Sequence, residues 1–121
     1  MKPKQSPTND LTQRILKHLY SVGVYAWRQN TLPVPVVRAG VFSGFRPASK
    51  SGLPDIFAVL FPLGRLLCIE IKTGKDRLRP EQIGFHANVR KMGGLVLVVK
   101  DWDDYVAQMT QLSTEIEMKF F

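Results

Sequence analysis

The apolar residues between positions 6 and 23 repeat at helical spacing. Such a stripe is typical of an amphipathic helix that buries one face. Ser6 followed by Pro7 is typical of an N-cap and first helical turn, and Gly23 favours the helix end. We therefore predict a helix that begins between Ser6 and Asn9 and ends at Gly23. Its apolar stripe consists of Leu11, Ile15, Leu16, Leu19 and Val22.

Four other segments carry patterns typical of strands. Residues 24–29 alternate apolar residues with larger or polar ones, which predicts a strand. Residues 55–61 and 66–72 flank a Pro-Leu-Gly turn at 62–64 and are predicted to form a hairpin. Residues 95–99 form a continuous run of Leu and Val, which indicates a strand covered on both faces.

Two more helices follow from capping signals and spacing. Pro80 and Glu81 favour a helix start, and Gly93-Gly94 favours its end. The inward stripe of this helix is predicted to be Gln82, Phe85, Val89 and Met92. A last helix is indicated by the helical spacing of Trp102, Tyr105, Val106, Met109, Leu112 and Ile116.

The predicted order is helix, three strands, helix, strand, helix. A strand that follows a helical crossover implies a mixed central β-sheet flanked by helices, that is, an α/β fold. A chain of 121 residues is long enough for one domain with one core, here residues 1–121. Residues 1–7 are polar and are expected to be flexible.

Residues 31–54 are predicted to form a long basic loop. The segment is rich in Pro and Gly and carries Arg38, Arg46 and Lys50, with no acidic residue before Asp55. A loop of this length in a small domain is usually functional or mobile. Val36-Val37 or Val41-Phe42 are candidates for a short hairpin within it.

The composition indicates a polyanionic partner. Seventeen Lys and Arg against ten Asp and Glu give a formal charge of +7, which suits DNA, RNA or an anionic membrane surface.

Cys68 is the only cysteine, so an internal disulfide and a thiolate metal cage are excluded. Cys68 is predicted to be a core residue. No apolar run approaches the length of a membrane span, and the N-terminus has no signal-peptide pattern. These features fit a cytoplasmic protein.

The predicted third strand carries polar residues where burial is expected. Residues two apart share one face of a strand, so Glu70 and Lys72 project from the same face at its C-terminal end. A buried carboxylate needs a cationic partner or a metal. One interpretation is a salt bridge from Glu70 to Lys72 or Arg65. The other requires a second acid near Glu70.

Asp55 supplies that second acid. It begins the preceding strand, and in a hairpin the start of one strand lies beside the end of the next. Two carboxylates directed at one place repel each other unless a divalent cation joins them. Oxygen ligands without His or Cys favour Mg²⁺ or Mn²⁺ over Zn²⁺.

These residues resemble a known family. Gly52-Leu-Pro-Asp55, a short hairpin, Ile69-Glu-Ile-Lys72 and then Gln82 are similar in order and spacing to the PD-(D/E)xK nucleases. More narrowly, the chain resembles the stand-alone VRR-NUC domain of phages and bacteria. The resemblance spans about residues 9–106 and includes the flanking segments 23–28, 79–82 and 93–94.

The resemblance implies a restriction-endonuclease-like α-β-β-β-α-β core and a role for each site residue. Asp55 and Glu70 would bind the cation with the backbone carbonyl of Ile71. Lys72 would act on the attacking water or on the charge of the phosphate, and Gln82 would face the site. Helical spacing also turns Gln82 inward, although satisfying a backbone group is an alternative role. The candidate DNA-binding residues are Arg28, Arg38, Arg46, Lys50, Lys75, Arg77 and Arg79.

The chain departs from the family pattern in its first helix. Related nucleases often carry an acidic metal ligand there, whereas this helix offers only Asp10 and Asn9. Asp10 is a candidate for a further metal ligand, but stabilisation of the helix N-terminus is favoured. His18 is predicted to be a surface or partly buried residue, and His86 to have a packing role rather than a phosphate contact.

The predicted activity is metal-dependent hydrolysis of phosphodiester bonds in DNA, with a preference for branched or junction substrates. A non-catalytic DNA-binding module and a small subunit of a DNA-processing complex are the alternatives. The resemblance also implies a homodimer and a bacterial, phage-encoded setting. The two terminal phenylalanines, Phe120 and Phe121, would pack either on a neighbouring copy or on their own core.

Overall fold

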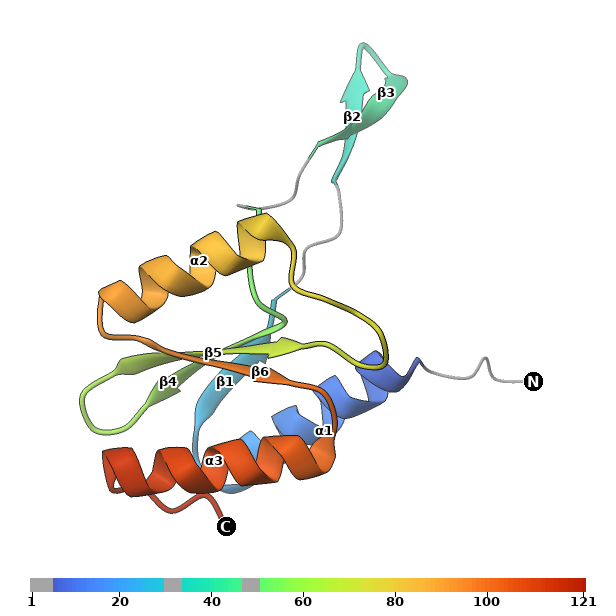
Figure 1. Ribbon diagram of the computed structural model, residues 1–121. Helices are drawn as coiled ribbons and strands as arrows, with labels where there is room; N and C mark the ends of the chain where they lie inside the picture. Colours follow the sequence, from blue (N-terminus) through green and yellow to red (C-terminus); the bar gives the residue numbers. More distant parts are fainter. Residues whose placement is uncertain (1–5, 30–33, 47–50) are drawn as a thin grey trace.

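Four strands form one mixed sheet in the order β1-β4-β5-β6 (Figure 1). In this computed structural model, which describes residues 6–29, 34–46 and 51–121, β4 pairs antiparallel with β1 and β5, and β6 pairs parallel with β5. The parallel pair requires the crossover through a helix. The predicted mixed sheet is thus confirmed. The strands are β1 Tyr25–Arg28, β4 Ile56–Leu60, β5 Arg65–Ile71 and β6 Leu95–Val99.

Helices cover both faces of this sheet. Helices α1 and α3 pack on one face, and α2 lies over the other (Figure 1). The core lies between the sheet and the α1–α3 layer, where Ile15, Leu67 and Met109 are fully buried. The helices are α1 Pro7–Ser21, α2 Pro80–Lys91 and α3 Trp102–Ile116.

Helix α1 forms as its sequence predicts. The Ser6 hydroxyl accepts a hydrogen bond from the backbone N–H of Asn9 at 3.1 Å, and Pro7 occupies the first turn. Leu11, Ile15 and Leu19 are buried. Ser6 and Pro7, expected among the flexible residues, are therefore part of the helix start, while residues 1–5 lie outside the described part of the chain.

Strand β6 differs in part from its prediction. Helices α2 and α3 both pack on it, as a strand covered on two faces requires. However, β6 is an edge strand, so Leu95 to Val98 are only half-buried and Val99 alone is buried.

The predicted inward stripe of α2 is wrong at its C-terminal end. Met92 is 80% exposed because it is the C-cap residue, beyond the last helical turn. The fully buried residues of the helix are instead Gln82 and His86, which are four positions apart and lie on one side of it.

A separate two-stranded sheet interrupts the long basic segment. Strands β2 (Val34–Arg38) and β3 (Val41–Arg46) pair antiparallel and project away from the body of the molecule (Figure 1). Both candidate dipeptides belong to it, and Val37 pairs with Phe42. Lys50 lies outside the described residues.

The C-terminal residues dock on their own chain. Phe120 is buried, and its carbonyl oxygen lies 2.6 Å from Nε2 of His18. The ring of Phe121 stacks on His18 at 4.3 Å between centroids. His18 is partly buried, as predicted. No helix within the described ranges has the length and apolarity that a bilayer crossing requires.

Candidate active site

The antiparallel pairing of β4 and β5 brings Asp55 to the C-terminal end of β5. Ile56 pairs with Ile69, so Asp55, one residue before β4, reaches the next residues of β5. Its Oδ2 accepts a hydrogen bond from the backbone N–H of Ile71 at 2.7 Å. Its carbonyl oxygen accepts another from Gln29 at 2.9 Å. Asp55 is therefore held at the C-terminal end of β5 by two backbone N–H groups, one of which binds its carboxylate.

Glu70 is buried beneath α2, with only 2% of its surface exposed. Gln82 Nε2 donates a hydrogen bond to its Oε1 at 3.1 Å. His86 Nε2 lies 3.1 Å from its Oε2. Each carboxyl oxygen thus has a partner on the same helix, and these two contacts fix the plane of the carboxyl group.

The pKa of Glu70 is raised to about 8. Burial is the main cause, and the negative charge of Asp55 and a side-chain hydrogen bond with Asp55 raise it further, while Lys72 and Arg79 act in the opposite direction. A carboxyl group in this position retains its proton at neutral pH unless another cation replaces it. Ionisation of both carboxyl groups at neutral pH therefore requires a cation beside them.

The donor set fits a hard divalent cation. Asp55 and Glu70 offer carboxylate oxygens, and Ile71, the residue after Glu70, donates its backbone N–H to Asp55. Oxygen donors are those that Mg²⁺ and Mn²⁺ prefer. Within the described ranges there is no group of three His, Cys, Asp or Glu side chains suited to a metal, so a cation here would depend on backbone or water oxygens as well.

His86 is the site residue that sequence reasoning missed. Burial lowers its pKa, as do the positive charges of Arg90 and Lys72, so the imidazole is neutral at pH 7 and its contact with Glu70 is a hydrogen bond. The available signal was its position four residues after Gln82, which puts both side chains on one side of α2.

Lys72 is partly buried, and its positive charge acts on Glu70. Its backbone N–H donates to Val99 at 2.9 Å, which fixes it to the parallel strand β6, and its Nζ is 3.8 Å from Asp76 Oδ2. Arg65 Nε donates to the carbonyl of Gly93 at 2.6 Å. Among the described residues, Glu70 therefore forms neither of the salt bridges that the simpler interpretation required.

Gly52 explains why the loop before Asp55 packs closely on α2. Its φ is +82°, and a Cβ at this position would lie 2.3 Å from the carbonyl oxygen of Glu81. Only glycine permits this approach at this backbone conformation. The next residue of α2, Gln82, accepts a hydrogen bond from the backbone of Arg79 at 2.9 Å through Oε1. Gln82 thus fills both predicted roles, contacting a backbone group and Glu70.

The first helix brings hydroxyl groups to this edge in place of a carboxylate. Thr8 Oγ1 lies 2.5 Å from Thr73 Oγ1, and buried Thr12 donates to the carbonyl of Thr8 at 2.7 Å. Asp10 is exposed in the first turn of α1, where its charge favours the helix N-terminus. Within the described residues it has no contact with Asp55 or Glu70.

The candidate DNA-binding residues fall into separate groups. Arg28 donates to the side chain of Asn9. Arg79 is exposed and pairs with Glu81 at 3.5 Å. Lys75 and Arg77 are exposed in the loop after β5, and Arg38 and Arg46 are exposed on the projecting hairpin.

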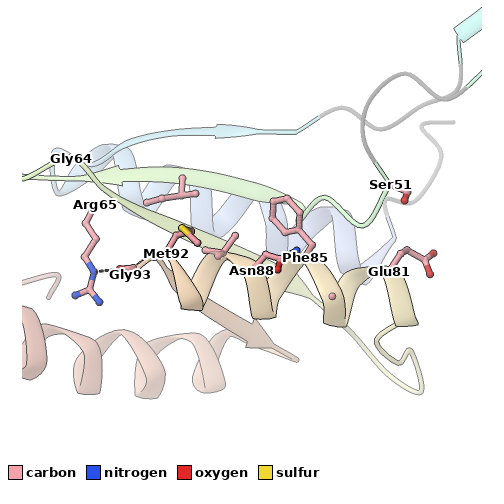
Figure 2. A pocket seen from close by; sticks show the side chains of 12 residues that line it. Ser51, Gly64, Arg65, Glu81, Phe85, Asn88, Met92 and Gly93 are labelled. Atoms are coloured by element: carbon pink, nitrogen blue, oxygen red, sulfur yellow. Dashed lines mark hydrogen bonds between the residues drawn. The ribbon is translucent and has the colours of Figure 1, made fainter.

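A groove of about 660 Å³ runs along α2. Figure 2 shows Glu81, Phe85 and Asn88 of α2 and its C-cap residue Met92 along the groove, with Ser51 at one end and Arg65 at the other. Asp55 and Glu70 are not among its lining residues. This groove is therefore separate from the two acids.

The VRR-NUC domain family matches residues 3–102, which include every residue of the site. The chain matches no curated protein and no solved structure.

Proposed function

The chain belongs to the VRR-NUC domain family, which comprises nucleases of the PD-(D/E)xK superfamily, and we propose that it hydrolyses DNA with a divalent cation, Mg²⁺ or Mn²⁺. The mixed sheet flanked by helices agrees with the restriction-endonuclease-like fold of that superfamily. Nuclease action on DNA follows from the family; the metal and the substrate preference are the proposal.

The proposed ligands are Asp55, Glu70 and the backbone carbonyl of Ile71. The closeness of the two acids supports this assignment. Asp55 accepts a hydrogen bond from the N–H of Ile71, and the negative charge of Asp55 raises the pKa of Glu70. A bound divalent cation supplies Lewis-acid polarisation of the phosphate and a water of lowered pKa. One cation is proposed, because Asp10 is exposed and α1 offers threonines at this edge.

The other site residues act on orientation and charge. Lys72 is proposed to place its ammonium group beside the scissile phosphate and to stabilise the negative charge that grows there. Gln82 donates a hydrogen bond to Oε1 of Glu70 and would hold that carboxylate in position for the cation. Exposed Lys75 and Arg77, close along the chain to Lys72, are proposed to contact flanking phosphates.

The test is cleavage of plasmid, linear, single-stranded, flap and junction DNA with Mg²⁺ or Mn²⁺. Asp55→Ala, Glu70→Ala and Lys72→Ala are each expected to lower the rate by two orders of magnitude or more, because each removes a ligand or a charge at the reacting phosphate. Asp103→Asn and Lys91→Ala, on exposed positions of α3 and α2, are matched controls. Retained cleavage in all three site variants would refute the assignment.

The same assay separates the alternatives. Salt-dependent DNA binding without cleavage by the wild type, at any tested metal, would indicate a non-catalytic binding module or a subunit of a larger complex. A preference for forks or junctions over linear duplex would support structure-selective action.

A homodimer is proposed on family grounds alone. Phe120 does not serve as its contact, since it is buried in its own chain. Light scattering at micromolar concentration tests the proposal, and a monomer mass would contradict it. A cytoplasmic, phage-encoded setting likewise stays a prediction.

A further inference from the structure

The β2–β3 hairpin has two chemically different faces. Pro35 pairs with Phe45 and Val37 with Phe42, so these four apolar residues share one face, and the two phenylalanine rings meet edge to face at 5.2 Å. Arg38 and Arg46, each one residue farther along its strand, lie on the opposite face. Val41, which pairs with Arg38, also lies on that face. The hairpin is therefore a ribbon with one apolar, aromatic face and one face that carries both arginines.

The apolar face is open. Phe42 is 58% and Phe45 67% exposed, and Val37 is exposed to a similar degree. An isolated two-stranded hairpin is marginally stable in water, and grouped exposed apolar side chains usually mark an interaction surface. The exposed apolar residues of the hairpin therefore indicate a surface that binds a partner.

The charge of the segment indicates the chemical class of that partner. Between Asp10 and Asp55 the sequence holds no acidic residue, so neither face of the hairpin carries a negative charge. Arginine and aromatic side chains in one segment are the combination that binds nucleic-acid backbone and stacks on bases. A second copy of the chain would cover the phenylalanines but would leave the basic face and the lack of acids unexplained.

The hairpin is also attached at the candidate active site. It is inserted between the end of β1 and Asp55, and these two ends are joined by the hydrogen bond from Gln29 N–H to the Asp55 carbonyl. It extends from this edge of the sheet (Figure 1). The hairpin is therefore the insertion that leaves the sheet beside Asp55.

We propose that the β2–β3 hairpin is a wedge for branched DNA. Phe42 and Phe45 stack on the exposed base pair or unpaired bases at a branch point, and Arg38 and Arg46 bind phosphates of the strand that diverges. The proposal rests on the proposed function and deepens it, because it names the element that would select branched over linear DNA.

The test is equilibrium binding in EDTA, which removes cleavage from the measurement. Fluorescence anisotropy compares a fork with the linear duplex of the same sequence. Stacking contributes about five- to 150-fold in affinity per base. Phe42→Ala with Phe45→Ala is therefore expected to weaken fork binding at least tenfold and duplex binding less than threefold. Arg38→Ala with Arg46→Ala is expected to weaken both and to lower the salt slope by about 2.

Two further pairs of substitutions keep the result interpretable. Phe42→Tyr with Phe45→Tyr retains the ring faces and is expected to preserve fork preference, which excludes an effect of hairpin unfolding. The control is Phe61→Ala with Leu63→Ala, which removes two exposed apolar residues beyond the opposite end of β4 and is expected to change neither affinity. A 2-aminopurine base at the branch reports stacking directly through its fluorescence.

Three results would overturn the inference. The first is an equal loss of affinity for fork and duplex when Phe42 and Phe45 are replaced by alanine. The second is unchanged affinity for both DNAs in that variant. The third is conversion of a wild-type dimer to a monomer by the alanine pair, which would assign the apolar face to a second copy. Failure of the proposed function is distinguishable, since it would appear as missing metal-dependent cleavage by a wild type that still prefers forks.

Discussion

Glu70 combines burial, a neighbouring acid and two hydrogen-bond partners on α2. Such a carboxyl group is costly to ionise without a cation. Its raised pKa means that the folded chain binds a proton that the unfolded chain has already released between pH 4.5 and about 8. The residue therefore links stability, pH and metal binding in a way that experiments can separate.

Stability of the metal-free protein should depend on pH with a defined sign. Because the folded pKa of Glu70 is raised, its contribution is fully present below about pH 4.5 and is lost as pH rises to about 8. The loss is on the order of 5 kcal/mol at most. Urea unfolding in EDTA should show lower stability at pH 8.5 than at pH 5.5, and Glu70→Gln should flatten this difference. An unchanged slope in Glu70→Gln would show that other groups control it.

His86 is expected to act through Glu70. His86→Leu removes the partner of Oε2 and should weaken Mn²⁺ binding about tenfold or more, as loss of a metal ligand's supporting contact usually does. His86→Gln, which retains a donor, should recover part of the affinity. Calorimetric titration with Mn²⁺ measures this, and equal affinity in wild type and His86→Leu would contradict the role.

At the scale of elements, the site depends on contact between one loop and one helix. The loop before β4 carries Asp55, α2 carries Gln82 and His86, and Gly52 is where the two backbones meet. Gly52→Ala should lower the unfolding free energy by about 2 kcal/mol or more, because it combines a left-handed conformation with a backbone clash. Gly74→Ala is the matched control, since it shares a positive φ but has open space around it.

Urea unfolding and Mn²⁺ affinity of these two glycine variants should diverge. Gly52→Ala is expected to impair both, because the loop and α2 must separate. Gly74→Ala should cost only backbone strain and leave Mn²⁺ affinity within about threefold of wild type. Equal effects of the two substitutions would remove the special role of the Gly52 contact.

Most elements were predictable because their signals are local. The Ser6-Pro7 start of α1, the hairpin around residues 62–64 and the Pro80 start of α2 are all set by a few neighbouring residues. The edge position of β6 was not, since a run of Leu and Val reads the same at an edge as in the centre. The hydrogen bond between His86 and Glu70 was also missed, because it joins residues on two separate elements, α2 and β5.

At the scale of the whole molecule, the distribution of charge predicts how DNA is held. The formal charge of +7 and the exposed basic groups on the hairpin and after β5 imply binding dominated by phosphate contacts. Affinity for any DNA should fall by about tenfold or more between 50 and 200 mM salt. Anisotropy titrations at four salt concentrations measure the slope, and a salt-independent affinity would argue against this surface.

The central claim is that Asp55 and Glu70 together hold one divalent cation at the edge of β4 and β5. Calorimetric titration of Mn²⁺ into the wild type, Asp55→Asn and Glu70→Gln at pH 8 tests it most directly. The account predicts one cation per chain in the wild type and at least tenfold weaker binding in each variant, with all three proteins folded. Wild-type affinity in both variants would contradict it.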